Sequence, residues 1–90
     1  MIASIQGILE AKGPDYAIIN VAGIGFQVYV PTSTLADLEE IGQRVRLHTH
    51  MYFKEDNLSL YGFNTAEELR LFGLLKNVAG MGPRTALKAI

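Results

Sequence analysis

The sequence contains no cysteine and no tryptophan, and only 3 of its 90 residues are proline. Without cysteine the chain can form neither a disulfide bond nor a zinc site with thiolate ligands. A chain of this length forms one small domain, or one domain plus part of another. It buries only about 60–65% of the surface that its unfolded chain exposes. Its stability therefore depends on its apolar residues, which make up 49% of the sequence, or on association with other chains.

Long hydrophobic runs are also missing. The longest nearly apolar stretch, YAIINVAGIGF at residues 16–26, is about half as long as a membrane-spanning helix. The first residues, MIASIQGILEAKG, have neither the basic region nor the apolar region of a signal peptide. These observations predict a soluble protein of the cytoplasm.

The charge is nearly balanced but unevenly distributed. A net charge of −1 argues against a protein that is uniformly basic for nucleic-acid binding. Residues 1–63 carry four basic and seven acidic residues, a charge of −3, whereas residues 64–90 carry four basic and two acidic residues, a charge of +2. An ordinary mixed surface would give the same asymmetry, so the charges alone leave a nucleic-acid partner open.

The pattern of residues 1–63 predicts a β domain. Turn signals such as Gly13-Pro14-Asp15 separate runs rich in apolar and β-branched residues, and the expected strands are 2–12, 16–21, 26–30, 44–53 and 57–63. Residues 33–42 are predicted to form a short helical turn that is capped by Ser33 or Thr34 and ends at Gly42. Five short strands with one helical insertion predict a closed five-stranded barrel of the OB type, with an open meander as the alternative.

From residue 64 the pattern becomes helical. Thr65 and Glu68 form a capping box at the start of a helix, and the apolar residues Leu71, Leu75 and Val78 recur at helical spacing, which predicts a helix to about residue 78. A second helix is predicted to begin at Pro83, because proline suits a first helical position.

The segment AGMGPR between the two predicted helices is a candidate anion site. Gly80 and Gly82 allow a sharp reversal of the backbone, and the start of the next helix presents amide groups to which a phosphate can bind. Arg84 and, one turn further along, Lys88 would add positive charge. A plain helix–helix turn with a glycine cap is the alternative, but the order helix, GMGPR, helix is typical of the helix–hairpin–helix motif, which holds DNA phosphates without reading bases.

Three other patterns favour structural roles. The second G-x-G, in VAGIGF, precedes a strand rather than a helix, so a hairpin turn is expected instead of a dinucleotide site. His48 and His50 share one face of a strand, but no third ligand accompanies them, and no metal site is predicted. The strand aromatics are expected to pack mostly in the core, although an OB-fold can also expose some of them to stack on bases.

Glu55 and Asp56 are adjacent acids between two predicted strands. On an extended strand they would point to opposite faces, so they could not face each other across a substrate at about 5–9 Å as glycosidase carboxylates do. No serine or histidine nearby suggests nucleophilic catalysis, and no catalytic residue is predicted. In a turn both acids would project into water, and the residues alone leave open whether this is a solvated turn or a negative tip with a function.

The chain as a whole resembles the RuvA family of bacterial proteins that recognise Holliday junctions. The resemblance runs in order along all 90 residues and is carried by MIASIQGILEAKGP, VAGIGFQVYVP, THMYFKEDNLSLYGF and ELRLFGLLKNVAGMGPRTALKAI. It implies an OB-fold for residues 1–63, and for residues 64–90 the first helix–hairpin–helix of a larger helical domain. The second such motif and a C-terminal domain are lacking, so a fragment or the ordered part of a longer protein is expected.

The resemblance also implies the function and the site residues. The family forms homotetramers on four-way DNA in recombination, DNA repair and the SOS response, without a cofactor. The hexameric ATPase RuvB, which joins through the C-terminal domain, and a junction resolvase are the implied partners. Glu55 and Asp56 match the acidic pin of the family, and Gly80, Met81, Gly82 and Arg84 match its phosphate-binding hairpin, with Lys88 and Lys54 as further DNA contacts. A generic OB-type module for single strands or a protein partner is the alternative function.

Overall fold

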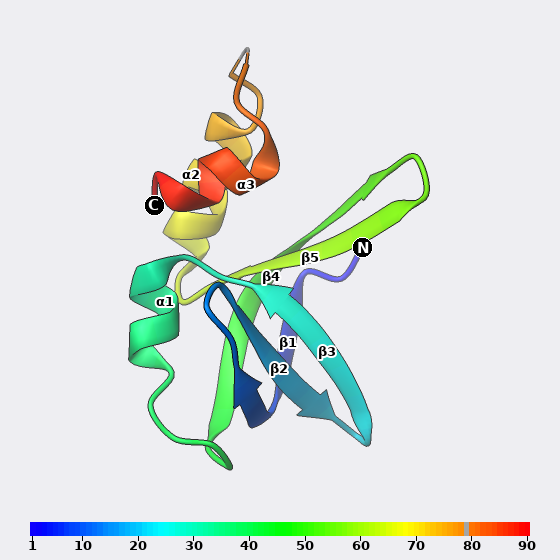
Figure 1. Cartoon of the computed structure of the whole chain (residues 1–90), viewed down its shortest axis with the longest axis vertical. Coiled ribbons are helices and arrows are strands. Elements are labelled where there is room, and N and C mark those ends of the chain that lie inside the picture. The colour runs from blue at the N-terminus through cyan, green and yellow to red at the C-terminus, as the bar shows by residue number, and fades with distance from the viewer. Residues whose placement is uncertain (79) are drawn as a thin grey trace.

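The computed structural model describes residues 1–78 and 80–90 of the chain. Figure 1 shows a β-barrel with two helices above it and a third helix at its side. The elements are β1 (Ser4–Lys12), β2 (Tyr16–Val21), β3 (Ile24–Tyr29), α1 (Thr32–Asp37), β4 (Arg44–Lys54), β5 (Asn57–Phe63), α2 (Ala66–Leu75) and α3 (Pro83–Lys88). The five predicted strands are confirmed, and each begins and ends within two residues of its expected position.

The five strands close into a barrel in the order β1-β2-β3-β5-β4. Neighbouring strands pair antiparallel, except that β3 and β5 pair in parallel at Tyr29 and Tyr61. This closed arrangement confirms the predicted OB-type barrel, and the open meander is wrong. The first half of β1, residues 4–8, pairs with β4 and the second half, residues 8–12, pairs with β2, so β1 closes the barrel by joining these two strands.

The interior of the barrel is filled by apolar side chains that alternate along the strands. On β1, Ile5 and Leu9 point inward on either side of Gly7. A Cβ at Gly7 would lie 2.2 Å from the carbonyl oxygen of Asn20, so only glycine lets β1 approach β2 this closely. Leu9, Ile19, Val28 and Leu47 are fully buried. The core therefore needs no disulfide to fix the barrel, in keeping with the absence of cysteine.

The hairpin predicted at VAGIGF is confirmed. Val21 pairs with Ile24, which leaves Ala22 and Gly23 as the connection between β2 and β3. Both residues have a positive φ, 54° and 91°, as a type I′ turn requires. The side chain of Asn20 accepts a hydrogen bond from the Gly23 amide at 2.9 Å.

The boundaries predicted for the first helix are wrong. Helix α1 begins at Thr32, directly after Pro31, and no side chain caps it. Thr34 instead lies inside the helix, where it is fully buried, and its Oγ1 has no hydrogen-bond partner among the described residues. The helix ends before Leu38, because Leu38 turns into the barrel core. Gly42 (φ 95°) lies in the turn that leads into β4.

The capping box of the second helix is confirmed, but the helix is shorter than predicted. The Glu68 amide donates to the Thr65 hydroxyl at 3.2 Å, and α2 runs from Ala66 to Leu75 rather than to Val78. After Leu75 the backbone forms tighter turns, since the Val78 amide donates to the Leu75 carbonyl and the Met81 amide to the Val78 carbonyl. Pro83 lies in the first turn of α3, as predicted.

A second core joins α2 and α3 to the barrel. It consists of Tyr61, Phe63, Phe72, Ala86 and Leu87. The ring of Phe72 lies 5.1 Å from that of Phe63 and 5.2 Å from that of Tyr61, measured between centroids. The helical pair is thus packed directly on β5, which fixes its position relative to the barrel. Among the described residues, no helix combines the length and the apolar character needed to cross a membrane.

Candidate nucleic-acid interface

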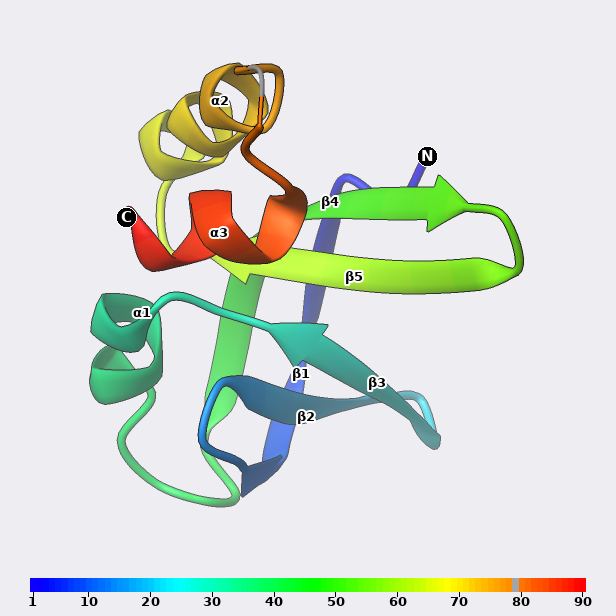
Figure 2. The same ribbon diagram turned by 45° about the horizontal axis from the view of Figure 1, so that its top comes forward.

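Strands β4 and β5 continue beyond the barrel as a two-stranded arm, seen clearly in Figure 2. Lys54 pairs with Asn57, so Glu55 and Asp56 form the connection at the tip of the arm. Both acids are exposed, as is Lys54. The structure therefore places the two acids in an exposed turn rather than on an extended strand.

The backbone of Glu55 is unusual for its residue type. Its φ is +56°, in the left-handed region that glycine and asparagine adopt most readily. Glutamate at this position costs backbone energy that glycine would not, and strained residues of this kind gather at functional sites. Ala22 has a similar φ of 54° in the β2–β3 hairpin, so the conformation of Glu55 is compatible with a plain tight turn as well as with a role for its side chain.

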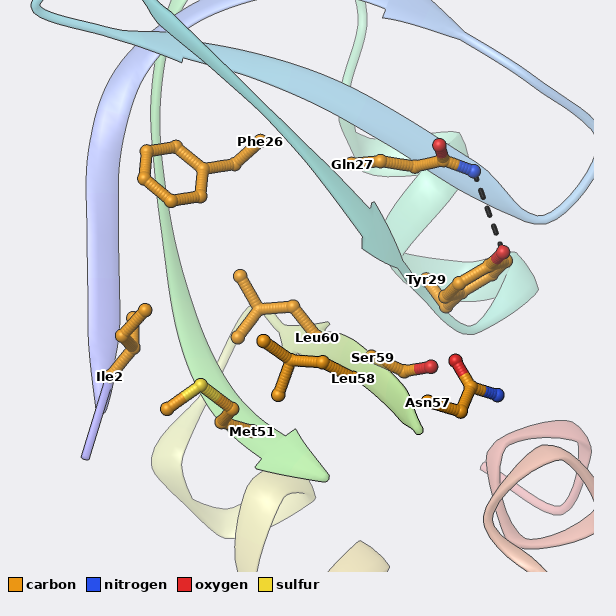
Figure 3. A pocket seen from close by; sticks show the side chains of 9 residues that line it. All are labelled: Ile2, Phe26, Gln27, Tyr29, Met51, Asn57, Leu58, Ser59 and Leu60. Atoms are coloured by element: carbon orange, nitrogen blue, oxygen red, sulfur yellow. Dashed lines mark hydrogen bonds between the residues drawn. The ribbon is translucent and has the colours of Figure 1, made fainter. Parts of the chain in front are cut away.

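The arm also carries exposed apolar side chains just behind the acids. Phe53 and Leu58 face each other across the two strands and are 66% and 60% exposed. Beside them, a hollow of about 260 Å³ lies between the arm and β3. Figure 3 shows Ile2, Met51, Leu58 and Leu60 around this space. This apolar surface was not predicted, although Phe53 and Leu58 stand symmetrically around the turn in the sequence.

The turn between α2 and α3 lies at the far end of the helical pair from the barrel (Figure 1). Gly80 has a φ of +81°, which explains why glycine occupies that position. Gly82 is different, because its φ of −83° suits any residue and a Cβ there would meet no atom within 4 Å. Gly82 is also the N-cap of α3, a position that favours glycine over alanine. Neither its φ nor the space around it requires glycine, however, so the open backbone is available for close approach by a ligand.

Arg84, predicted as a phosphate contact, lies against the barrel. Its Nη2 donates to the Asp15 carboxylate in an ion pair, and its guanidinium lies over the ring of Tyr29, 4.4 Å from the centroid. Lys88, one turn further along α3, is exposed, and both residues border a hollow of about 210 Å³ between α3 and the barrel. The sequence could not reveal the ion pair, because its partners are 69 residues apart.

The tyrosines near α3 pack on one another rather than forming a free stacking surface. Tyr29 contacts Tyr16 and Tyr61, with centroid distances of 6.4 and 5.8 Å. Burial raises the pKa of Tyr61, and the Ser59 hydrogen bond and the Arg84 charge act in the opposite direction. These contacts support the prediction of core packing for most aromatics and leave Phe53 as the most exposed aromatic among the described residues.

The two histidines of β4 lack neighbours that would complete a set of three metal ligands among the described residues. No cluster of three or more histidine, aspartate or glutamate side chains suited to a metal occurs within residues 1–78 and 80–90. His50 packs against Phe72 of α2, with 5.6 Å between ring centroids. Burial lowers the pKa of His50 from 6.5, and the positive charges of Lys76 and the N-terminus lower it further.

Acid is expected to destabilise the chain through His50. Its pKa is lower in the folded chain than the 6.5 of an unfolded chain, so the unfolded state takes up the proton first as the pH falls. Above pH 6.5 His50 is neutral in both states and does not reduce the free energy of unfolding. Between pH 6.5 and the lower pKa of the folded chain, protonation of the unfolded state reduces that free energy. Urea unfolding between about pH 8 and about pH 5 measures the loss. His50→Gln should reduce this loss; an equal loss in the variant and the wild-type protein would contradict the explanation.

Several of the predicted site residues are brought together, but in two separate places. Glu55, Asp56 and Lys54 share the tip of the arm, whereas Gly80, Met81 and Gly82 share the helical turn, with Arg84 and Lys88 on α3 below it. No acid, base and nucleophile converge at either place among the described residues. The arrangement offers a negative tip and an open backbone turn, which suit the repulsion and binding of an extended polyanion.

Comparison with known proteins identifies the family of the chain. A family model described as the RuvA N terminal domain matches residues 1–62. The chain is 53% identical, over 97% of its length, to the Holliday junction branch migration complex subunit RuvA of Dehalococcoides mccartyi strain CBDB1. Proteins of the same name from Roseiflexus sp. strain RS-1 and Acetivibrio thermocellus are 46% and 43% identical over the whole chain. The chain spans 45–46% of the length of these relatives.

Proposed function

The chain belongs to the RuvA N-terminal domain family, and from this premise we propose that it recognises four-way DNA junctions as a non-catalytic subunit of a branch migration complex. The relatives that it matches carry that function in their names. Junction DNA is a polyanion with a branched shape, so recognition requires groups that bind phosphate and groups that distinguish the branch point from a plain duplex.

Phosphate binding is assigned to the helical turn. We propose that residues 64–90 form a helix–hairpin–helix and that the backbone of Gly80, Met81 and Gly82 approaches the DNA phosphates. The observation that carries this proposal is the open position of Gly82. Its φ is one that other residues also adopt, and a Cβ there would meet no atom of the described chain within 4 Å. Arg84, Lys88 and Lys54 would supply positive charge, and all three are exposed. Binding of this kind does not depend on base sequence and weakens steeply with salt.

Distinction of the branch point is assigned to the tip of the arm. Glu55 and Asp56 would repel phosphates from the centre of the junction and steer the strands into separate paths, acting as an acidic pin. The strained backbone of Glu55 is compatible with a role for this side chain. Repulsion of this kind lowers affinity but improves selectivity for the correct DNA shape.

We propose that the chain assembles as a homotetramer through the arm. The exposed pair Phe53 and Leu58 would leave water when copies meet, beside the apolar hollow between the arm and β3. Four-fold symmetry would then bring four acidic tips together around one axis. A single negative tip on a monomer would have little effect, so the acids and the apolar pair support the same assembly.

The motor activity is assigned to a partner. The sequence contains no G-x-x-x-x-G-K-[ST] loop for ATP. We propose that the hexameric ATPase RuvB joins through the portion of the longer relatives that this chain does not span, with a junction resolvase as a further partner, in the bacterial cytoplasm.

A gel-shift comparison tests the proposed function. The chain should bind a four-way junction more tightly than a duplex of equal length, and a single strand least, in a salt-dependent manner. A generic OB-type module for single strands would show the reverse order. Equal binding to junction and duplex would contradict junction recognition, and no binding to any DNA would contradict the proposed function for this chain.

A further inference from the structure

Asp15 makes a contact to which the proposed function gives no role. It lies in the turn between β1 and β2, and it accepts a hydrogen bond from Nη2 of Arg84 on α3. This is the one ion pair within the described residues. It links the barrel to the helical pair across 69 positions of sequence, so it fixes the relation of two elements rather than the conformation of one.

The guanidinium of Arg84 is held from two directions. Asp15 binds its Nη2, while the ring of Tyr29 lies beneath its plane at 4.4 Å. Tyr29 in turn packs between Tyr16 and Tyr61, which belong to the barrel wall. An arginine side chain is flexible, and a fixed guanidinium loses less freedom when it binds a further anion.

Arg84 nevertheless keeps capacity for a second partner. Its side chain is 52% exposed, and a guanidinium has five N–H donors in a planar fork. The donors that Asp15 does not use can therefore meet a phosphate without breaking the ion pair. On the other side of α3, Ala86 and Leu87 are buried against the second core, so the helix cannot turn Arg84 away without disturbing that packing.

We propose that Asp15 is a positioning residue for DNA binding, which orients Arg84 and holds α3 at a fixed angle to the barrel. The proposal rests on the proposed function, because it takes Arg84 as a phosphate contact. It has an unusual consequence: removal of a negative charge from a DNA-binding protein should weaken binding. An acid that only repelled the DNA would have the opposite effect.

The test compares Asp15→Asn with Arg84→Gln in junction binding over a range of salt. Asp15→Asn should weaken binding about fivefold with an unchanged slope of log K against log salt, because the charge of Arg84 remains. Arg84→Gln should weaken binding and also make the slope shallower, by about 0.9 for each phosphate that the protein no longer neutralises. The double variant should bind as Arg84→Gln does, because Asp15 acts only through Arg84.

Glu40→Gln is the matched control, since it removes one exposed acid from another loop of the barrel. It should leave junction binding unchanged or slightly tighter. If Asp15→Asn behaves like this control, or if its effect adds in full to that of Arg84→Gln, the positioning role is wrong. Far-UV circular dichroism should show that all variants keep the fold, as expected for an exposed pair.

Hydrogen exchange of the free protein separates this inference from the proposed function. Asp15→Asn and Arg84→Gln should each speed amide exchange in residues 86–90 by a similar factor, and the double variant by no more than either. Unchanged exchange would overturn the role of the ion pair in holding α3. If the wild-type chain showed no preference for junctions, the proposed function would fail while this measurement still decided whether Asp15 and Arg84 hold the helix.

Discussion

Alanine at position 82 is expected to weaken junction binding at least tenfold while changing the stability of the chain little. The φ of −83° suits alanine, and the added Cβ would meet no atom of the described chain within 4 Å. Such a change removes freedom from the unfolded chain, which stabilises by about 0.4–1 kcal/mol. Because Gly82 is the N-cap of α3, where alanine is less favourable than glycine, the two effects oppose each other and the net change should be small. In the complex, however, the same methyl would stand between the backbone amides and the phosphate, and each copy in a tetramer would suffer the same loss.

Gly73→Ala provides the control for this prediction. Gly73 lies within α2, and a Cβ there would also meet no atom within 4 Å. Alanine in a helix interior stabilises by about 0.5–1 kcal/mol relative to glycine, so Gly73→Ala should raise the melting temperature and leave DNA binding unchanged. Thermal unfolding and fluorescence anisotropy with a labelled junction measure the two properties. If Gly82→Ala bound the junction as tightly as Gly73→Ala, the assignment of phosphate binding to the turn would be wrong.

Neutralising both acids at the tip of the arm, Glu55→Gln with Asp56→Asn, should make junction binding tighter by about three- to tenfold. Two unit charges about 8 Å apart in water repel by about 0.5 kcal/mol, and two such pairs at a junction centre sum to about 1 kcal/mol. Duplex binding should change less, because a duplex need not pass the centre. A 2-aminopurine base at the crossover should be brighter with the wild-type chain, since the acids keep the strands apart there.

The control for the acidic tip is Glu39→Gln with Glu40→Gln. These residues are also adjacent exposed acids, but they lie in the loop after α1, away from the arm in both Figure 1 and Figure 2. The same change of charge should have a smaller effect on junction binding and none on the 2-aminopurine signal. Weaker junction binding by the Glu55 and Asp56 variant would remove the proposed role of the pin.

The sequence predicted those parts of the fold that depend on local patterns. Runs of apolar and β-branched residues between turn signals located the five strands, the G-x-G of VAGIGF before a strand predicted the hairpin, and Thr65 with Glu68 located the start of α2. The ends of α1 were predicted wrongly because packing overrode capping preference: Thr34 is buried within the helix and Leu38 is drawn into the barrel core. Helix α2 stops early because the chain turns back toward α3.

The candidate site was predictable only in part, for a similar reason. The resemblance pointed to Glu55, Asp56 and the glycine turn, and the structure places the acids in an exposed turn and leaves Gly82 open. The surroundings of Arg84 were not predictable, because Asp15 and Tyr29 reach it through the folding of distant segments. The strained φ of Glu55 is likewise a property of the folded hairpin.

The mass of the complex with a four-way junction tests the central claim most directly. Junction recognition by an acidic centre requires several copies around one axis, so light scattering should give four chains of 9.9 kDa, or a multiple of four, on each junction. Phe53→Ser with Leu58→Ser should reduce this number while the monomer stays folded. One chain bound per duplex arm, with no change when Phe53 and Leu58 are replaced, would contradict the account.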